Sequence, residues 1–242
     1  MGCLHHRQPR SSESLVSDPA VNPNWVEAQK SDTPLHRACQ FGHHQVVQVL
    51  LKHPQIDVNA QDAEEATPLF LASQKGHTEV VALLVADKRV DVNKPWWDGV
   101  TPLLMACQEG HLDVIRLLLV HPRISCNKAD PVGYSPFFVA CQFGHTGVVR
   151  LLLADMRINV NRGNFEGTPL RIAASIGRLA VVQLILKSGR EGYSGFGPKR
   201  PCRRSKCSSR EIEEILLKRK ITSPSPPCLN LSPLTPQLLA SG

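Results

Sequence analysis

Long hydrophobic runs are missing from this sequence of 242 residues. Its apolar stretches are short, and residues 80–86 and 117–120 are typical of them. A membrane-spanning helix needs ~18 consecutive apolar residues, so we expect no transmembrane helix. The first 30 residues also lack the apolar core of a secretory signal, and we expect no export by that route.

Sequence signatures of catalysis are also absent. The chain has no Walker phosphate loop and no Gly-x-Ser-x-Gly nucleophile motif. Gly192, Gly195 and Gly197 do not follow a strand pattern, which is typical of a flexible linker rather than a phosphate-binding turn. We therefore expect a protein that is not an enzyme.

The net charge of +7 is confined to the C-terminal part of the chain. Residues 1–186 hold 17 basic and 17 acidic side chains, whereas residues 187–242 hold 11 basic and 4 acidic ones. A neutral body has no general attraction to phosphate groups, so affinity for nucleic acid or anionic lipid would have to come from the tail.

What the chain does contain is an internal repeat. A Thr-Pro-Leu or Ser-Pro-Phe motif recurs at intervals of 34, 34, 34 and 33 residues, and each copy continues with a pair of small residues, a glycine and an apolar helical stripe. The motifs begin at Thr33, Thr67, Thr101, Ser135 and Thr168, the glycines are Gly42, Gly76, Gly110, Gly144 and Gly177, and four copies close with Asn59, Asn93, Asn127 or Asn161.

One unit of the repeat predicts two short antiparallel helices. A Thr or Ser before Pro is typical of a helix start, because the hydroxyl accepts a free backbone N–H and the proline ring presets the helical φ. The glycine can take the left-handed conformation that ends this helix, and a second helix follows. Neither helix can bury its apolar stripe without the next copy, so the units are expected to stack.

These residues resemble the ankyrin repeat family, in the Thr33-Pro34-Leu35-His36-x-Ala38 motif, the Gly42-His43 turn and the Val46-Val47-x-x-Leu50-Leu51 helix. The resemblance covers residues 18–187 and implies an all-α repeat solenoid, an ankyrin-type stack of helix-turn-helix units with β-hairpin-like loops. It implies about five full repeats, beginning near residues 32, 66, 100, 134 and 167, plus degenerate caps. Such stacks usually bind other proteins through the concave face and the loop tips.

Departures from the family pattern predict local differences. Only the first copy keeps the histidine of the motif, so we expect apolar contact to replace part of the polar network at Phe70, Leu104 and Phe138; the fifth copy has Arg171. Glu65 stands where other copies have glycine, and the fifth copy is one residue short, so these loops are expected to differ in shape.

The segments outside the repeats have their own predictions. Residues 1–17 are expected to be flexible, and residues 17–22 resemble 87–93, which predicts a truncated first repeat with Trp25 as a cap residue. We expect a Gly/basic linker at 188–207, a degenerate capping helix at 208–220 and a disordered Pro/Ser-rich tail at 221–242.

Cysteine and histidine positions favour structural roles. Cys39, Cys107 and Cys141 occupy equivalent repeat positions where other copies have Ser or Ala, and Cys126 replaces a valine. Cys202, Cys207 and Cys228 lack the second close pair of a zinc site. The histidines His43, His77, His111 and His145 recur after the turn glycine. We expect no metal and no cofactor, and reduced thiols suit the cytoplasm or the nucleus.

Candidate partner-binding residues are those at which the copies differ. Aromatic side chains in the loops and at the ends of the first helices could form one exposed strip, and aromatic residues often dominate binding energy. Alternatively, one Trp folds over its own hairpin and the phenylalanines fill gaps between repeats. The candidates are Trp96, Trp97, Asp98, Tyr134, Phe143, Phe165 and Phe41.

A basic cluster at 199–206 leaves several interpretations open. It could be a nuclear-import signal, a nucleic-acid patch or a solvated linker, and no aromatic residues interleave with it. Its basic residues are Lys199, Arg200, Arg203, Arg204 and Lys206.

The sequence therefore predicts a monomeric, non-enzymatic scaffold that binds a protein partner through hairpin tips and concave face. The alternative is a nuclear regulator whose stack binds a transcription component and whose basic tail directs import or contacts nucleic acid. We expect neither nucleic acid nor a membrane as the main partner. Membrane anchoring is not expected because Met1-Gly2-Cys3 lacks the later Ser or Thr of acylated starts and has His6 there. The location is expected to be cytoplasmic, nuclear or both.

Overall fold

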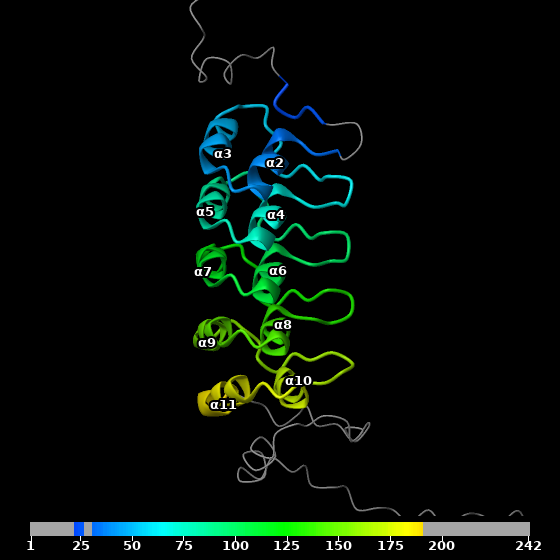
Figure 1. The fold of residues 1–242 in the computed structure, drawn as a ribbon, viewed down its shortest axis with the longest axis vertical. Coiled ribbons are helices and arrows are strands. Elements are labelled where there is room, and N and C mark those ends of the chain that lie inside the picture. Colours follow the sequence, from blue (N-terminus) through cyan, green and yellow to red (C-terminus); the bar gives the residue numbers. More distant parts are fainter. Residues whose placement is uncertain (1–21, 27–30, 191–242) are drawn as a thin grey trace, which may run out of the picture.

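The structure, a computed structural model, describes residues 22–26 and 31–190, and this part of the chain holds ten helices and no strand. The helices are α2 (Pro34–Gln40), α3 (His44–Leu51), α4 (Pro68–Lys75), α5 (Thr78–Ala86), α6 (Pro102–Glu109), α7 (Leu112–Val120), α8 (Pro136–Phe143), α9 (Thr146–Ala154), α10 (Pro169–Ser175) and α11 (Leu179–Ser188). Figure 1 shows them in two columns, with the even-numbered inner helices beside the odd-numbered outer ones.

Each inner helix begins as its sequence predicts, and α4, α6 and α8 end at the predicted glycine, whereas α2 and α10 have Phe41 and Ile176 as C-caps, one residue before it. The residue before the first proline is extended, and its hydroxyl accepts the backbone N–H three residues later, as Thr67 does from Phe70 and Thr101 from Leu104. The glycine that ends α4 has φ of 76°, and Gly110 after α6 has φ of 82°. These local signals therefore set the length of the helices.

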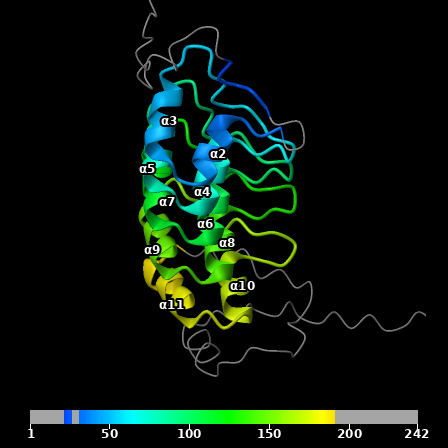
Figure 2. The ribbon, with the colours of Figure 1, turned by 45° about the horizontal axis from the view of Figure 1, so that its top comes forward.

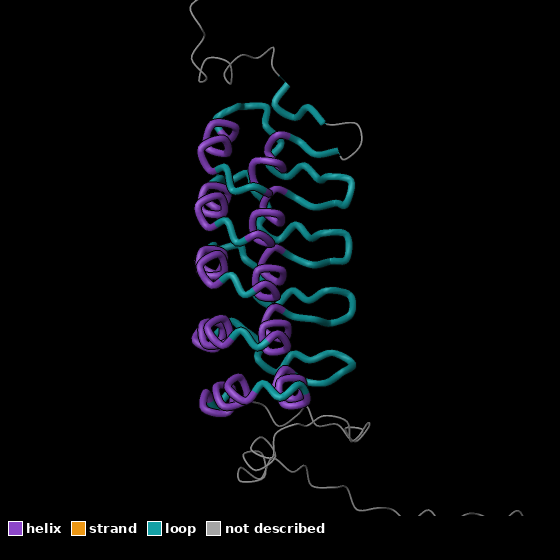
Figure 3. The backbone as a smooth tube through the Cα atoms, viewed as in Figure 1, coloured by secondary structure: helices purple, strands orange, loops and turns teal. Residues whose placement is uncertain are grey.

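The core is continuous along the stack because each helix packs on its counterparts in the neighbouring units. Large side chains such as Leu69 and Leu84 are fully buried, while small ones such as Ala72 and Cys107 lie where the helices approach closely. Figure 3 shows the helix pairs joined by loops along the whole array. The predicted all-α repeat solenoid is confirmed.

A ladder of asparagines joins successive units. Asn93 donates from Nδ2 to the Arg123 carbonyl at 2.6 Å and accepts from the Ser125 N–H at 2.7 Å. Asn59 and Asn127 make the same pair of hydrogen bonds one unit earlier and one unit later. The asparagine that closes each copy therefore holds the loop of the next one.

The ladder also corrects the predicted alignment of the N-terminal segment. Asn24 donates to the Gln55 carbonyl at 2.7 Å and accepts from the Asp57 N–H at 2.8 Å. Asn24, and not Asn22, is therefore the counterpart of Asn93, and the predicted register is wrong by two residues. Trp25 is 64% exposed.

The recurring histidines cap the preceding unit. Nε2 of His77, His111 and His145 lies 3.0, 3.0 and 2.7 Å from the carbonyl oxygens of Gln40, Gln74 and Gln108 respectively. These carbonyls lie at the ends of inner helices, where no partner exists within the helix. The expected structural role of these histidines agrees with the geometry.

The motif histidine of the first copy is buried, and its replacements are apolar. His36 Nε2 donates to the carbonyls of Ala60 and Ala66, each at 3.1 Å. Phe70, Leu104 and Phe138 occupy the equivalent sites and are buried. Apolar contact therefore replaces this polar bridge, as expected.

Glu65 does not change the shape of its loop, contrary to expectation. Its φ is 63°, close to the 74° of Gly99, and its N–H bonds to the Asp62 carbonyl as that of Gly99 bonds to the Trp96 carbonyl. The loop of the fifth copy does differ, since Asn164 and Gly167 exchange both backbone hydrogen bonds in a tighter turn.

Several predicted features lie outside the described residues. They are the flexible segment 1–17, residues 191–207 of the linker predicted at 188–207, the capping helix at 208–220, the tail at 221–242 and the basic cluster with Lys199, Arg200, Arg203, Arg204 and Lys206. The linker begins later than predicted, because Ser188 is the last residue of α11.

Candidate functional site

The loops between outer and inner helices project from one side of the stack as hairpins. Figure 2 shows them following one another along one edge. The second hairpin (62–66) closes with a bond from the Asp62 N–H to the Ala66 carbonyl at 3.0 Å. The third (96–100) closes from Trp96 to Val100 at 2.9 Å. Their tips are thus held in similar shapes on neighbouring units.

Trp96 is anchored on inner helix α4. Its ring stacks on Phe70 of α4 with centroids 5.3 Å apart, in a small apolar cluster with Ala66 and Met105. Its Nε1–H is buried and has no acceptor among the described residues. A buried donor without an acceptor costs about 1–3 kcal/mol, which the packing of the ring has to offset.

Trp97 has the opposite environment. It is 65% exposed and contacts Trp96 edge to face, with ring centroids 6.4 Å apart and planes at 73°. Asp98 beside it is exposed as well. The pair therefore consists of one anchored indole that supports one indole open to solvent.

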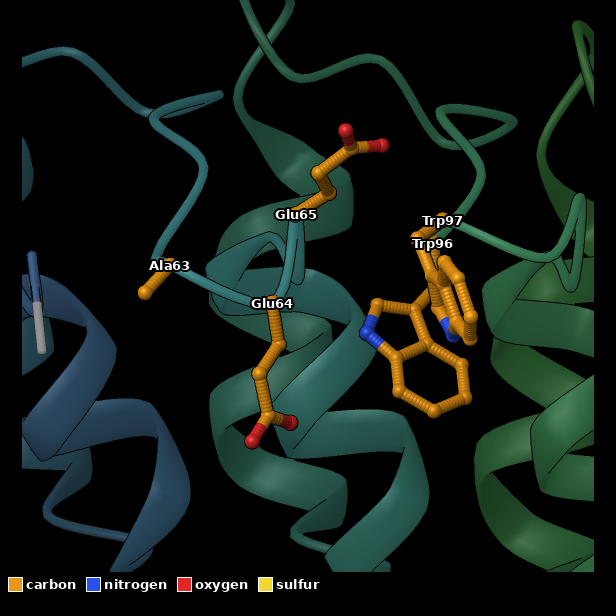
Figure 4. Close-up of a pocket in the computed structure, with 5 residues that line it drawn as sticks. All are labelled: Ala63, Glu64, Glu65, Trp96 and Trp97. Atoms are coloured by element: carbon orange, nitrogen blue, oxygen red, sulfur yellow. The ribbon is translucent and has the colours of Figure 1, made fainter.

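A pocket of about 460 Å³ lies between the second and third hairpins, lined by Ala63, Glu64, Glu65, Trp96 and Trp97. Figure 4 shows the glutamates on one hairpin and the indoles on the next, with open space between Glu64 and the rings. Neither glutamate belongs to an ion pair within the described part of the chain. The walls thus combine aromatic faces with uncompensated negative charge.

A second depression of about 330 Å³ adjoins this pocket and shares Ala63 and Glu64 with it. It extends along the inner helices to Arg37 of α2 and Gln74 of α4. Arg37 forms an ion pair with Asp32 at 3.6 Å. The two hollows together make a surface that runs from the hairpin tips to the inner helices.

The remaining candidate aromatics lie elsewhere on the stack. Tyr134 packs edge to face on Phe138 at 5.3 Å, and its burial together with the nearby Glu166 carboxylate raises its pKa. Phe165 is 79% exposed on the fifth hairpin.

Phe41 and Phe143 lie at the ends of α2 and α8 and stack on the imidazoles two residues further along. In Figure 1, α4 and α6 stand between these two helices. The structure therefore brings Trp96 and Trp97 together, but the predicted single aromatic strip does not form.

The sequence prediction missed three residues of this region. Glu64 and Glu65 supply the charge of the pocket, and Phe70 supplies the platform under Trp96. The available signal was the departure of Glu65 and Phe70 from the repeat pattern at positions that face the next hairpin.

The cysteines of the repeats are buried away from this surface. Desolvation raises the pKa of the Cys39, Cys107 and Cys141 thiols far above the usual range, which keeps them protonated and unreactive. Among residues 22–26 and 31–190, no group of three His, Cys, Asp or Glu side chains is placed to hold a metal ion. The helices of that part are too short to cross a bilayer.

Comparison with known families agrees with the fold. The family model described as ankyrin repeats (three copies) matches residues 6–95, 55–130, 87–164 and 123–194, and these overlapping matches cover more than half of the chain. A search of curated proteins finds no match. The matched segments contain all the helix pairs of the described residues, and the chain belongs to the ankyrin repeat family.

Proposed function

We propose that the chain is a non-enzymatic scaffold that binds a protein partner through the second and third hairpins, with Trp97 as the central contact. Ankyrin repeats generally mediate protein–protein interaction. The observation that carries the proposal is the exposure of Trp97, 65%, at the rim of a pocket. A large rigid indole buries much area on binding and loses little rotamer freedom.

The anchoring of Trp96 supports this role for Trp97. Because Trp96 is stacked on Phe70, the neighbouring indole has a firm base rather than a mobile loop. A contact residue that is already ordered costs less entropy on association. The depression along α2 and α4 extends the surface toward the concave side, which gives a partner a second area of contact.

The repeated polar side chains support binding without chemistry. His77, His111 and His145 are engaged with carbonyls of the preceding unit, and the arginines Arg89 and Arg157 bond to carbonyls at the ends of outer helices. These groups are used to join units. The role that the geometry supports best is therefore recognition of another protein.

Replacing Trp97 tests the proposal. With the full chain as bait, Trp97→Ala is expected to lower the recovery of specifically bound proteins at least about tenfold, since central aromatic contacts are worth about 2 kcal/mol or more. Recovery from cell extract would be measured by quantitative mass spectrometry after circular dichroism shows equal helix content.

Trp25→Ala is the matched control, because Trp25 is 64% exposed but lies far from the pocket residues in sequence and does not line it. It is expected to leave recovery within about twofold. Equal recovery by wild type and Trp97→Ala would exclude this site as the partner-binding surface.

A further inference from the structure

The pocket between the second and third hairpins combines aromatic and acidic side chains. Indole faces attract cations more strongly than other aromatic side chains do. Trp96 and Trp97 supply indole rings on one wall, and Glu64 and Glu65 line the other, with their carboxylates pointing to opposite sides of the hairpin in Figure 4. An acidic ligand would meet like charge on the carboxylate side, and an uncharged ligand could stack on the indoles but would leave the negative charge uncompensated.

The local charge around the pocket is strongly negative. Asp62 and Asp98 belong to the same two hairpins as the glutamates, and no lysine or arginine lines the pocket. Lys94 is the basic residue next to the third hairpin, and its ammonium is turned to the Asn59 carbonyl at 2.8 Å. A cation entering the pocket would therefore meet several carboxylates with little competition.

The neighbouring hairpin provides an internal comparison. The fourth hairpin has Val132 and Gly133 at the places of Glu64 and Glu65, so it presents no carboxylate there. Its aromatic residue, Tyr134, is packed on Phe138, and the hairpin has no counterpart of the exposed Trp97 indole, since Pro131 stands at that place. The combination of two indoles with two glutamates is thus a property of the second and third hairpins rather than of the repeat.

The size of the pocket limits its occupant. A volume of about 460 Å³ is near the lower end of the ~300–1,000 Å³ of small-ligand sites. It suits one long side chain and the backbone beside it rather than a whole helix. Lysine and arginine fit because their apolar stems can lie along an indole while the charged end reaches a carboxylate.

We propose that this pocket binds a basic side chain from an extended, positively charged segment of the partner protein. The inference rests on the proposed function, since it assigns the chemistry of the partner to the same surface. Arg37, paired with Asp32 in the adjoining depression, would mark the limit of the cationic contact, and the partner's next residues would be neutral or acidic there.

The first test measures binding of defined peptides to the full chain by fluorescence anisotropy at low salt. The probes are labelled heptapeptides Gly-Lys-Gly-Lys-Gly-Lys-Gly, the same peptide with arginine, and the same peptide with glutamate. The lysine or arginine peptide is expected to bind at least about tenfold more tightly than the glutamate peptide. The net charge of the chain, +7, would favour the glutamate peptide, so tighter binding of a basic peptide cannot come from net charge alone.

The second test uses variants of the pocket. Glu64→Gln with Glu65→Gln, and separately Trp97→Ala, are each expected to weaken the basic peptide about fivefold to tenfold. Glu79→Gln, an exposed change on α5, and Trp25→Ala are the matched controls and are expected to stay within twofold. The glutamine variants keep side-chain size and lie at exposed positions, so folding is expected to persist.

The outcomes separate this inference from the proposed function. Absence of binding by both basic peptides, or unchanged affinity of the basic peptides in the glutamine variant, would each overturn the cation pocket. If capture of protein partners still depends on Trp97 in that case, the scaffold function stands and only the chemistry of the partner is wrong. If capture is independent of Trp97, both proposals fail.

Discussion

Glu65 is a residue whose backbone conformation conflicts with its side chain. Its φ of 63° lies in the left-handed region, which costs a residue with a Cβ about 1–2 kcal/mol. Neighbouring bonds enforce it, since the Asp62 carboxylate accepts the N–H groups of Glu64 and Ala66, and Gln61 donates to the Glu65 carbonyl. The chain therefore retains a strained residue at the rim of the pocket, where its carboxylate is exposed.

Glu65→Gly is expected to stabilise the protein. Relief of the left-handed strain exceeds the added entropy of a glycine, about 0.5–1 kcal/mol, so the net gain is about 0.5 kcal/mol. Urea unfolding of the full chain would measure it. The variant also loses one carboxylate and should bind the basic peptide more weakly. Its stability is therefore expected to rise while its affinity for the peptide falls.

Gly99→Ala is the opposite control for the same turn. Its φ is 74°, and an added Cβ would meet the Pro131 ring at 2.9 Å, so the urea midpoint should fall. A loss of stability in Glu65→Gly would contradict the account of strain at this position.

At the level of elements, the units are joined by bonds between each loop and the next. The asparagine ladder supplies two hydrogen bonds per junction, and arginines add others, as Arg157 does to the Leu119 carbonyl at 2.7 Å. Arg89 and Arg157 also pair with Asp87 and Asp155, and these hydrogen bonds lower the pKa of both carboxyls. Neighbouring hairpins are held in register by these contacts, which places the glutamates opposite the indoles.

Asn93→Ala is expected to destabilise the stack by about 1–3 kcal/mol, since it removes two hydrogen bonds of about 0.5–1.5 kcal/mol each between the second and third units. Denaturant unfolding would measure the change. Asn93→Asp keeps the acceptor for the Ser125 N–H but loses the donor to the Arg123 carbonyl, and is expected to lower stability too. An effect of Asn93→Ala below about 0.3 kcal/mol would show that the ladder contributes little.

Across the whole molecule, the sequence predicted the elements well because their signals are local. The Thr-Pro start, the glycine end and the apolar stripe all lie within one unit. Five copies of this pattern in the sequence therefore predict five helix pairs. The register of Asn24 was missed because the first copy is incomplete and the spacing there does not follow the full repeat.

The candidate site was predicted only in part, because its properties arise between units. Trp96 and Trp97 are adjacent and chemically identical, and only contact with Phe70 of α4 makes one anchored and the other exposed. Glu64 and Glu65 look like ordinary loop residues until the hairpins are placed side by side. Spacing along the chain does not carry information of this kind.

The arrangement of the stack puts the proposed binding surface on one edge. Inner helices contact only nearby units, and the hairpins form a row beside them (Figure 2). Val120 lies on outer helix α7 and is 83% exposed, so exposure alone does not distinguish it from Trp97. The two positions differ in the surface to which they belong, and this difference can be tested directly.

Site-specific photocrosslinking tests the central claim most directly. A benzophenone amino acid would replace Trp97 in one full-length variant and Val120 in another, and covalent products formed in cell extract would be separated by mass. The account predicts a discrete crosslinked protein from position 97 and none from position 120, because the partner contacts the hairpin edge. Crosslinks from position 120 with none from position 97 would contradict it and place the partner on the outer helices.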